Sequence, residues 1–262
     1  MKSKKIIQAL LGKPTMLYEK FHQDTKLGFR FPKQEYKIFS SPSRIAHKEY
    51  LRLEKIVLPT PQDIKIPLTK TLRNRLSTRD FSKDPISLKT LSQLLFFAAG
   101  VTRQGKRPYP SAGALYPLEV YLLSQRTDIP KGLYHYNIRL HVLEILTQTI
   151  PSKVIRTLFI QESIKNAPCI LFITARFPRN TVKYGNRGYR HVLQEVGHLS
   201  QNIYLLSCAL DIGCVSIGGF KDDAVNTLLV VDGLEETVIN VIAVGRKNKK
   251  SLTKEKTPVR LK

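Results

Sequence analysis

The pattern of apolar and polar residues changes near residue 70. Upstream, five prolines between Pro32 and Pro67 interrupt the apolar stretches and exclude a long helix or strand. Downstream, apolar residues recur with the helical period from Leu88 to Ala98, which predicts an amphipathic helix. We therefore expect residues 1–70 to form an N-terminal arm that wraps on a separate body.

Strands and helices alternate in the second part of the chain. Alternating apolar and polar residues predict strands at 118–123 and 141–146, and a continuous apolar run predicts a central strand at 169–173. A helical period over 189–210 predicts the longest helix. A run rich in β-branched residues predicts a last strand at 237–244. This succession indicates an α+β body.

The periodic part of the chain corresponds to one domain, residues 71–247. The 262 residues, 42% hydrophobic and 24% charged, have the composition of a folded globular protein. Lysine and arginine dominate after Arg246, so we expect residues 248–262 to form a basic, disordered tail. Much of the net charge of +23 lies in the arm and this tail, and the body is only mildly basic.

The charge distribution bears on the class of partner. A basic nucleic-acid-binding protein, or a scaffold without catalysis, is one alternative that so high a net charge raises. Because the excess is terminal and no zinc-finger, homeodomain or RNP-like string is present, we do not expect nucleic acid as the partner. No apolar run approaches the roughly 18 residues of a membrane span, so no membrane partner is expected either.

Cysteine usage bears on the compartment. Cys169, Cys208 and Cys214 are odd in number, lack CxxC spacing and lie in apolar segments, which disfavours a disulfide framework or a zinc site. The N-terminus lacks the features of a signal peptide. We expect a cytoplasmic protein.

Two segments have the chemistry of a site for an anionic, planar ligand. The string RLSTR at 75–79 supplies two guanidinium groups with a hydroxyl between them, which suits bidentate binding of phosphate. The string PSAGA at 110–114 is a turn of small residues whose backbone can approach a flat ring closely. Each string alone is common on protein surfaces, so the argument depends on their combination.

Seven strings occur in an order and spacing that resemble one enzyme family. They are RLSTR (75–79), PSAGALYPLE (110–119), GLYHY (132–136), KYGNRGYR (183–190), EVGHLSQN (195–202), SIGGF (216–220) and VGRK (244–247). The set resembles the SagB-type azoline dehydrogenases, a branch of the FMN-dependent nitroreductase family. The resemblance implies an α+β nitroreductase-like fold, with a mixed central sheet flanked by helices, in a homodimer. FHQDTK at 21–26 is similar to the N-terminal element of that branch.

The resemblance also implies FMN as the cofactor and assigns residues to it. The RxSxR segment would bind the phosphate and ribityl chain, with an arginine after the last strand returning to the phosphate. The PSAG segment would reach the flavin from the partner subunit, and the Gly-Gly turn would lie beside the isoalloxazine. The residues so assigned are Arg75, Leu76, Ser77, Arg79, Pro110, Ser111, Ala112, Gly113, Ile217, Gly218, Gly219 and Arg246.

The catalytic candidates are Lys183 and Tyr184, since azoline dehydrogenases carry a Lys-Tyr pair at the active site. Aromatising a thiazoline or oxazoline removes a proton from the α-carbon and transfers a hydride from the adjacent ring carbon to flavin N5. A base must therefore stand beside the flavin. Free tyrosine, with a pKa of about 10, is a poor base at neutral pH, but an adjacent ammonium favours the phenolate. The implied partners are a ribosomally made precursor peptide and a cyclodehydratase complex, with dioxygen reoxidising the flavin.

A same-class alternative is a generic FMN oxidoreductase that uses NAD(P)H to reduce nitroaromatics or quinones. Common nitroreductases continue the PSS turn with polar residues and a QPW-like ending, whereas this chain has PSAGALYPLE, which favours the dehydrogenase branch. The absence of a dinucleotide GxGxxG does not separate the two, because nitroreductases bind nicotinamide without one.

Histidines offer one further chemical possibility. His191, Glu195 and His198 share one face of the predicted long helix, a spacing that could hold a metal. Nothing else completes a ligand set, so we predict no metal site. His135 and His141 are expected on strand surfaces.

Overall fold

A computed structural model of the chain describes residues 16–26, 47–102, 105–161, 164 and 167–248. The predicted arm is therefore described in two pieces. The predicted basic tail lies outside the described residues except for Asn248. Within the described ranges, no helix is long and apolar enough to cross a membrane.

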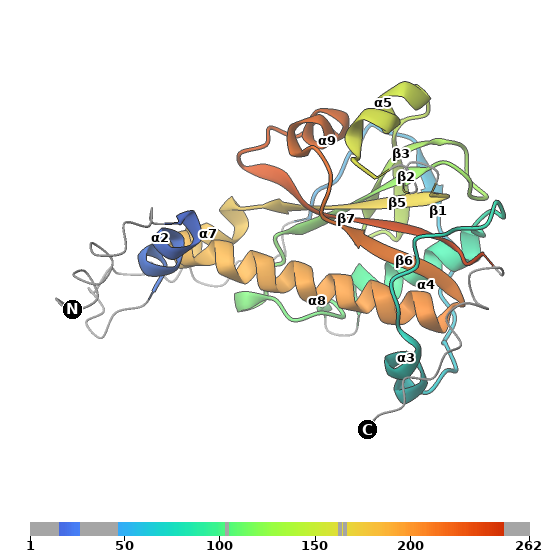
Figure 1. Cartoon of the computed structure of the whole chain (residues 1–262), viewed down its shortest axis with the longest axis horizontal. Helices are drawn as coiled ribbons and strands as arrows, with labels where there is room; N and C mark the ends of the chain where they lie inside the picture. The colour runs from blue at the N-terminus through green and yellow to red at the C-terminus, as the bar shows by residue number, and fades with distance from the viewer. Residues whose placement is uncertain (1–15, 27–46, 103–104, 162–163, 165–166, 249–262) are drawn as a thin grey trace.

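A seven-stranded sheet in the order β1-β4-β3-β2-β5-β7-β6 forms the centre of the molecule (Figure 1). Strands β2, β3 and β5 are buried along nearly their whole length, because helices or the chain before β1 cover them. The strands are β1 (Lys55–Val57), β2 (Leu118–Ser124), β3 (Gly132–Asn137), β4 (Val142–Thr147), β5 (Cys169–Arg176), β6 (Ile212–Ile217) and β7 (Glu236–Arg246).

Every pairing between these strands is antiparallel. The family resemblance implied a mixed sheet, and this detail is corrected: parallel pairing among the described residues is limited to isolated bridges, such as Ser77 with Cys214. For two of the pairings the reason is the connections. Short turns join β2 to β3 and β3 to β4, and a short turn can link only antiparallel neighbours.

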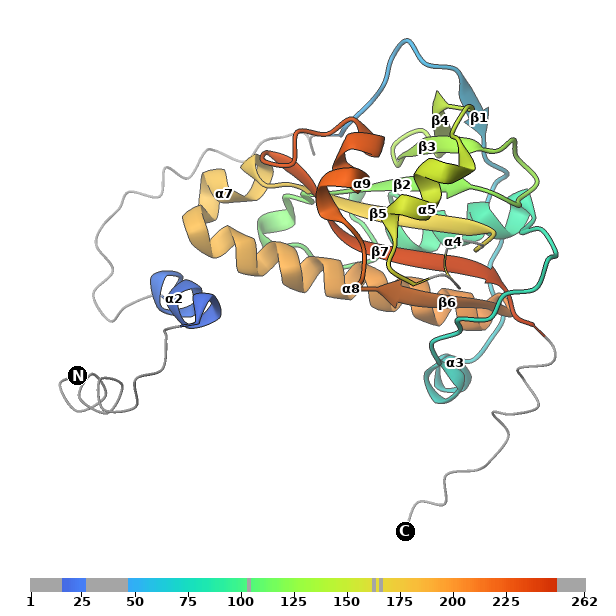
Figure 2. The same ribbon diagram turned by 45° about the horizontal axis from the view of Figure 1, so that its top comes forward.

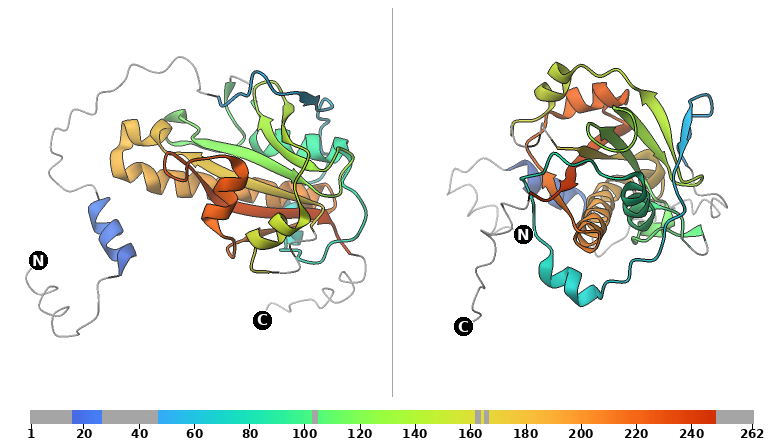
Figure 3. Two further views of the ribbon diagram at one scale, coloured as in Figure 1. Left: turned by 90° about the horizontal axis from the view of Figure 1, so that it is seen from above. Right: turned by 90° about the vertical axis from the view of Figure 1, so that its right-hand side faces the viewer.

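Helices cover both faces of the sheet (Figure 3). One apolar core lies on the side of α4 and α8, and a second lies on the side of α5 and α9. The helix α8 runs along the sheet, with α7 at its beginning and α3 beside its C-terminal half (Figure 2). The helices are α2 (Leu17–Asp24), α3 (Leu68–Asn74), α4 (Leu88–Ala99), η2 (Ala112–Ala114), α5 (Ser152–Leu158), α7 (Pro178–Tyr184), η3 (Gly185–Arg187), α8 (Gly188–Ala209) and α9 (Asp222–Leu229).

Strongly periodic elements lie where the sequence predicted them. The helices expected from Leu88 and over 189–210 are α4 and α8, and the four predicted strands are β2, β4, β5 and β7, with bounds differing by at most three residues. The elements β6 and α7 were not predicted, and β3 was indicated only by the expectation that His135 lies on a strand. The segment that forms α7 has seven residues, PRNTVKY, too few to show an apolar stripe.

Candidate functional site

The RLSTR segment lies between β6 and α8. Ser77 pairs with Cys214, and the Thr78 N–H donates a hydrogen bond to the Cys214 carbonyl at 2.9 Å. The Ser77 hydroxyl lies 3.1 Å from the Tyr204 hydroxyl, which accepts a second hydrogen bond from the Ser216 N–H at 2.8 Å. The segment is thus fixed by contacts to a strand and to a helix.

Arginine residues lie in and near this segment. The Arg75 guanidinium lies 5.4 Å from the centre of the Tyr204 ring, and both Arg79 and Arg246 are exposed. Arg246 comes close because the chain after Arg79 runs beside the end of β7, where the Ser82 N–H donates to the Arg246 carbonyl at 2.9 Å. Arg246, although far from the RLSTR segment in sequence, therefore lies at the same end of the sheet, and its Nε donates to the Pro85 carbonyl at 3.0 Å.

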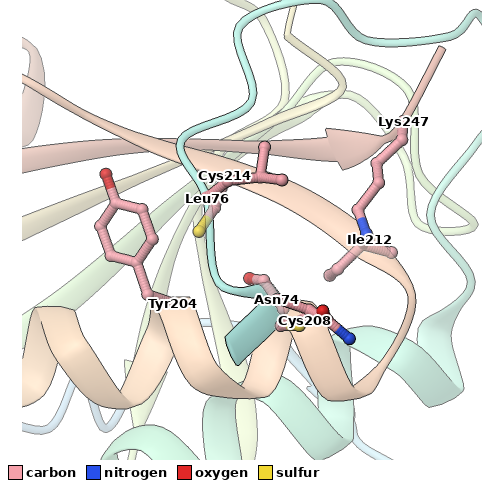
Figure 4. Close-up of a pocket in the computed structure, with 8 residues that line it drawn as sticks. Asn74, Leu76, Tyr204, Cys208, Ile212, Cys214 and Lys247 are labelled. Carbon is pink, nitrogen blue, oxygen red and sulfur yellow. The ribbon is translucent and has the colours of Figure 1, made fainter. Parts of the chain in front are cut away.

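A pocket opens beside these cations (Figure 4). Leu76, the apolar residue of the predicted set, contributes to its wall, and Lys247 adds another positive charge whose Nζ lies 3.4 Å from the Asp211 carboxylate. The pocket is lined by Asn74, Leu76, Tyr204, Ser207, Cys208, Ile212, Cys214 and Lys247.

The glycine turn after β6 leaves open space. A Cβ added at Gly218 would meet no heavy atom within 4 Å, and one added at Gly219 would lie 3.5 Å from Ile160. Near the end of β6, the Ser216 hydroxyl donates a hydrogen bond to Asn240 Oδ1 at 2.7 Å. Guanidinium groups and hydroxyls suit a phosphate, and open glycine backbone suits a flat ring, so the residues present fit the flavin that the resemblance implied.

Lys183 and Tyr184 form a second cluster, at the end of α7. A Cβ at Gly113 would lie 2.8 Å from Tyr184 Oη and 3.1 Å from Lys183 Nζ, and Gly113 has a φ of 64° that favours glycine. Ser111 supports the turn, because its hydroxyl accepts a hydrogen bond from the Tyr116 N–H at 2.9 Å. The predicted PSAG segment thus packs on the predicted catalytic pair of its own chain.

The two clusters lie at opposite ends of α8. Tyr184 packs edge-on against His191 near the beginning of the helix, with ring centres 4.6 Å apart, whereas Ser77 contacts Tyr204 near its end. The thirteen residues from His191 to Tyr204 span about 20 Å at 1.5 Å per residue. Figure 1 shows α7 and α3 at these two ends. One chain therefore keeps the cationic cluster and the Lys-Tyr cluster apart.

A buried chain of charged groups connects α7 to the sheet. Arg179 Nη1 lies 2.6 Å from Glu119 Oε1, the other Glu119 oxygen lies 3.2 Å from His135 Nε2, and His135 Nδ1 lies 2.8 Å from a Glu144 oxygen. The side chains of Glu119, His135 and Glu144 are fully buried. Arg179 precedes Lys183 by one helical turn, so this network holds the face of α7 that carries Lys183.

The network shifts the pKa values of its members. Burial alone would raise the pKa of Glu119, but the hydrogen bond with His135 and the charges of Arg179, His135 and Arg107 lower it to about 2. Burial alone would lower the pKa of His135, but its hydrogen bonds to Glu119 and Glu144 outweigh burial and raise this pKa. The network therefore contains ionised groups that stabilise one another.

The structure corrects two histidine predictions and adds residues. His135 is fully buried rather than on a strand surface, and His141 lies in the turn before β4 with a φ of 54°, its Nε2 2.9 Å from the Ser92 hydroxyl. Sequence reasoning also missed Tyr204 and Glu119. Tyr204 had a signal in the sequence, because it comes two residues after the EVGHLSQN string on the predicted long helix.

The helix face with His191, Glu195 and His198, for which no metal site was predicted, has its side chains in different environments in the described part of the chain. Glu195 is buried, whereas His198, on the same helix, is exposed. No group of three potential metal ligands occurs among the residues described.

Comparisons with known proteins agree with the order of the motifs. The model of the Nitroreductase family matches residues 72–246. The nitroreductase-like protein MJ1384 of Methanocaldococcus jannaschii is 37% identical over 195 residues, which cover 73% of this chain and 96% of that protein.

Two further comparisons involve peptide processing. The microcin B17-processing protein McbC of Escherichia coli is 32% identical over 164 residues, 57% of this chain and 58% of McbC. A chain in the structure of the E. coli microcin synthetase McbBCD complex, with truncated pro-MccB17 bound, superposes with a TM-score of 0.62 at 26% identity. That superposition covers 87% of this chain and 86% of the other. In the sequence comparison, the match to McbC spans little more than half of that relative.

Proposed function

The chain belongs to the nitroreductase family of oxidoreductases, and from that premise we propose that it is an FMN-dependent dehydrogenase that oxidises thiazoline or oxazoline rings to azoles in a ribosomally made peptide. The observation that carries the proposal is the contact of Lys183 and Tyr184 with the Gly113 turn. It places a candidate acid-base pair against the segment that the resemblance assigns to the flavin. The similarity to McbC, named for microcin B17 processing, supports a peptide as the substrate.

The cationic cluster would hold the cofactor. Arg75, Arg79 and Arg246 supply the charge for a phosphate, and Ser77 supplies a hydroxyl already oriented by Tyr204. The open backbone at Gly218 and Gly219, which follows Ile217, would face the ring system. Bound FMN would accept the hydride of the reaction at N5.

The Lys-Tyr pair would move the proton. The Tyr184 oxygen removes the proton from the α-carbon of the azoline, while the Lys183 ammonium, 5.3 Å from the centre of the Tyr184 ring, stabilises the negative charge on that oxygen. The absence of a side chain at Gly113 leaves the space that both groups occupy. The pair thus supplies the base that the flavin cannot provide.

A homodimer would bring the two clusters to one flavin. Within a chain they are separated by about 20 Å along α8. In a symmetric dimer, each site is built from different parts of the two protomers. The Pro110 to Gly113 turn and the Lys-Tyr pair of one protomer would then complete the cationic cluster of the other. This arrangement is the geometry that the family resemblance implied for the PSAG segment.

The substrate would arrive with partners. The McbBCD complex contains a chain of this fold together with other proteins and a precursor peptide. We therefore propose that a cyclodehydratase forms the azoline rings and that this chain oxidises them within or beside such a complex.

A generic NAD(P)H-dependent nitro or quinone reductase is the second candidate. The observation that favours it is the match to MJ1384, which extends over 96% of that nitroreductase-like protein and is closer in sequence than the match to McbC.

One assay separates the candidates. Protein incubated with FMN and dioxygen is expected to remove two daltons per ring from an azoline-bearing peptide, as measured by mass spectrometry. A parallel reaction with NADPH and a nitroaromatic compound measures the competing activity. Rapid NADPH oxidation with an unchanged peptide would reject the dehydrogenase and support the reductase. A purified protein that stays colourless after incubation with FMN would reject both.

The cationic cluster predicts which residues retain FMN. Replacing Arg75 with alanine removes a charged hydrogen-bond donor worth about 1.5–3 kcal/mol, so FMN is expected to bind about 10- to 150-fold more weakly. Arg73→Ala, on α3, has the same change in charge and serves as the control. Fluorescence titration of the apoprotein with FMN measures both affinities. Equal weakening in the two variants would indicate a general effect of net charge rather than a phosphate site.

The shared site predicts complementation between inactive variants. Arg75→Ala and Tyr184→Phe alter opposite ends of α8, so a mixed dimer contains one site with both changes and one with neither. At an FMN concentration that saturates the parental protein but not Arg75→Ala, coexpressed variants are expected to recover about a quarter of parental azole formation, because about half of random dimers are mixed and each has one intact site. Coexpressed Lys183→Ala and Tyr184→Phe, which alter the same end, are the control. Absence of recovery, with mixed dimers verified by mass, would place each site within one chain.

A further inference from the structure

Buried side-chain nitrogen and oxygen atoms without hydrogen-bond partners gather around the Lys-Tyr cluster. Buried polar groups are normally paired, and those that are not often serve a chemical role or contact water. In the described part of the chain, α7, the first half of α8 and the approach to the PSAG turn carry such groups. They belong to Arg107, Arg179, Asn180, His191 and Glu195.

His191 and Glu195 extend from Tyr184 into this region. The Tyr184 and His191 rings are perpendicular, with centres 4.6 Å apart. Glu195 follows His191 by one turn on the same face of α8, which places the two side chains beside each other. His191 Nδ1 is buried and has no hydrogen-bond partner among the described residues. Tyr184 is thus in ring contact with His191, and Glu195 lies one helical turn further along α8; no hydrogen bond joins the three side chains in the described structure.

The surroundings of Glu195 suit a group that accepts and releases a proton. Its side chain is 1% exposed, and neither carboxylate oxygen has a hydrogen-bond partner in the described chain. Burial raises its pKa to about 7, and the nearby Ser111 hydroxyl and the charge of Arg107 offset this only in part. The other ionisable group coupled to it is Tyr109, whose pKa is raised chiefly by burial.

His191 is suited to pass a proton on. Burial, and then the charge of Arg187, lower the pKa of His191, so its ring is neutral at neutral pH and has a nitrogen free to accept a proton. Glu195 next to it is partly ionised at the same pH.

We propose that His191 and Glu195 form a proton relay that restores the Tyr184 base after each abstraction. This inference rests on the proposed dehydrogenase function. The Tyr184 hydroxyl, once it has taken the substrate proton, gives it to one His191 nitrogen, and the other nitrogen gives a proton to the Glu195 carboxylate. No electrons move in these steps. Glu195 stores one proton, which returns along the same line when the site is open to solvent.

The relay predicts a loss of turnover without a loss of fold. Glu195→Gln keeps the shape and removes the proton acceptor, so azole formation is expected to fall at least about tenfold while FMN occupancy and thermal stability stay unchanged or rise. In the parental protein, azole formation should decrease as pH falls below about 7, because protonated Glu195 cannot accept another proton. This inflection should be missing in Glu195→Gln. Glu235→Gln, at an exposed position, is the control.

A second variant and a spectrum keep the test decisive. His191→Ala is expected to lose activity that added imidazole restores, whereas His198→Ala, on the exposed side of α8, should need no rescue. Infrared spectra should contain a protonated-carboxyl band that titrates near pH 7 and is absent from Glu195→Gln. Parental rates and pH profiles in both variants would overturn the relay and show that Tyr184 exchanges its proton directly with solvent. A parental protein that oxidises no azoline would reject the proposed function instead, and the infrared titration would still decide the state of Glu195.

Discussion

Tyr184→Phe and Lys183→Ala are each expected to lose about 10²- to 10⁴-fold of azole formation while FMN occupancy stays near the parental level, because general-base catalysis typically contributes that factor. Tyr184→Phe removes only the oxygen that would take the α-proton. Lys183→Ala removes the ammonium that stabilises charge on it, and both residues lie far along α8 from the cationic cluster. The measurement is the two-dalton loss per ring by mass spectrometry, run beside flavin quantification.

Tyr189→Phe is the matched control for this pair. Tyr189 stacks on Phe177 with ring centres 5.3 Å apart and meets Phe21 of α2 edge-on, so its ring is held away from the Gly113 turn. Its variant should keep parental activity. Parental rates in both Tyr184→Phe and Lys183→Ala would show that another group is the base. Loss of FMN or of the fold in both would make the pair structural, and Tyr189 would then be the next candidate.

Glu119→Ala is expected to destabilise the protein by about 3–5 kcal/mol, because it leaves Arg179 and His135 buried without their shared partner. For a chain of this size the loss corresponds to a fall of roughly 10 °C in the melting temperature. Glu49→Gln is the control. Glu49 forms more exposed ion pairs with Lys55 and Arg139, which contribute at most about 1 kcal/mol. Thermal unfolding at one fixed protein concentration compares the variants, and equal melting temperatures would contradict a stabilising network.

The same network predicts a dependence of stability on pH. The pKa of Glu119 is lowered to about 2 from an ordinary value of 4.5, so its contribution is fully present only above about pH 5.5 and is lost as the pH falls through 4.5 towards 2. The raised pKa of His135 has the opposite sign, so its contribution is lost as the pH rises through that value. Replacing Glu119 should flatten the acid side of the melting-temperature profile.

Local periodicity predicted the elements that have a long apolar stripe. The spacing of apolar residues in α8 and the β-branched run of β7 each follow from one stretch of sequence, which is why their bounds agree closely. Short elements such as α7 have no such stripe and owe their structure to contacts made elsewhere in the chain. Arg179, for example, holds α7 through a carboxylate on β2.

The candidate site required contacts between distant segments. The contact of Gly113 with Tyr184 joins residues 71 positions apart, and the contact of Ser77 with Tyr204 joins residues 127 positions apart. The motif order indicated the cationic cluster and the Lys-Tyr cluster, but it did not indicate that they lie at opposite ends of one helix. His135 was expected on a strand surface. It is buried because Tyr50 covers β3, with its ring centre 5.3 Å from that of His135.

The position of β7 constrains when the chain can fold during synthesis. In the described residues, β6 pairs along its length only with β7, and β7 also lies against β5, so it occupies the place between two strands made before it. When β6 leaves the ribosome, its sheet edge is unpaired until β7 follows about twenty residues later. Such pairing between distant strands is slow and leaves apolar surface open to aggregation. We expect nascent chains stalled before Glu236 to be protease-sensitive and those extended past Arg246 to become resistant.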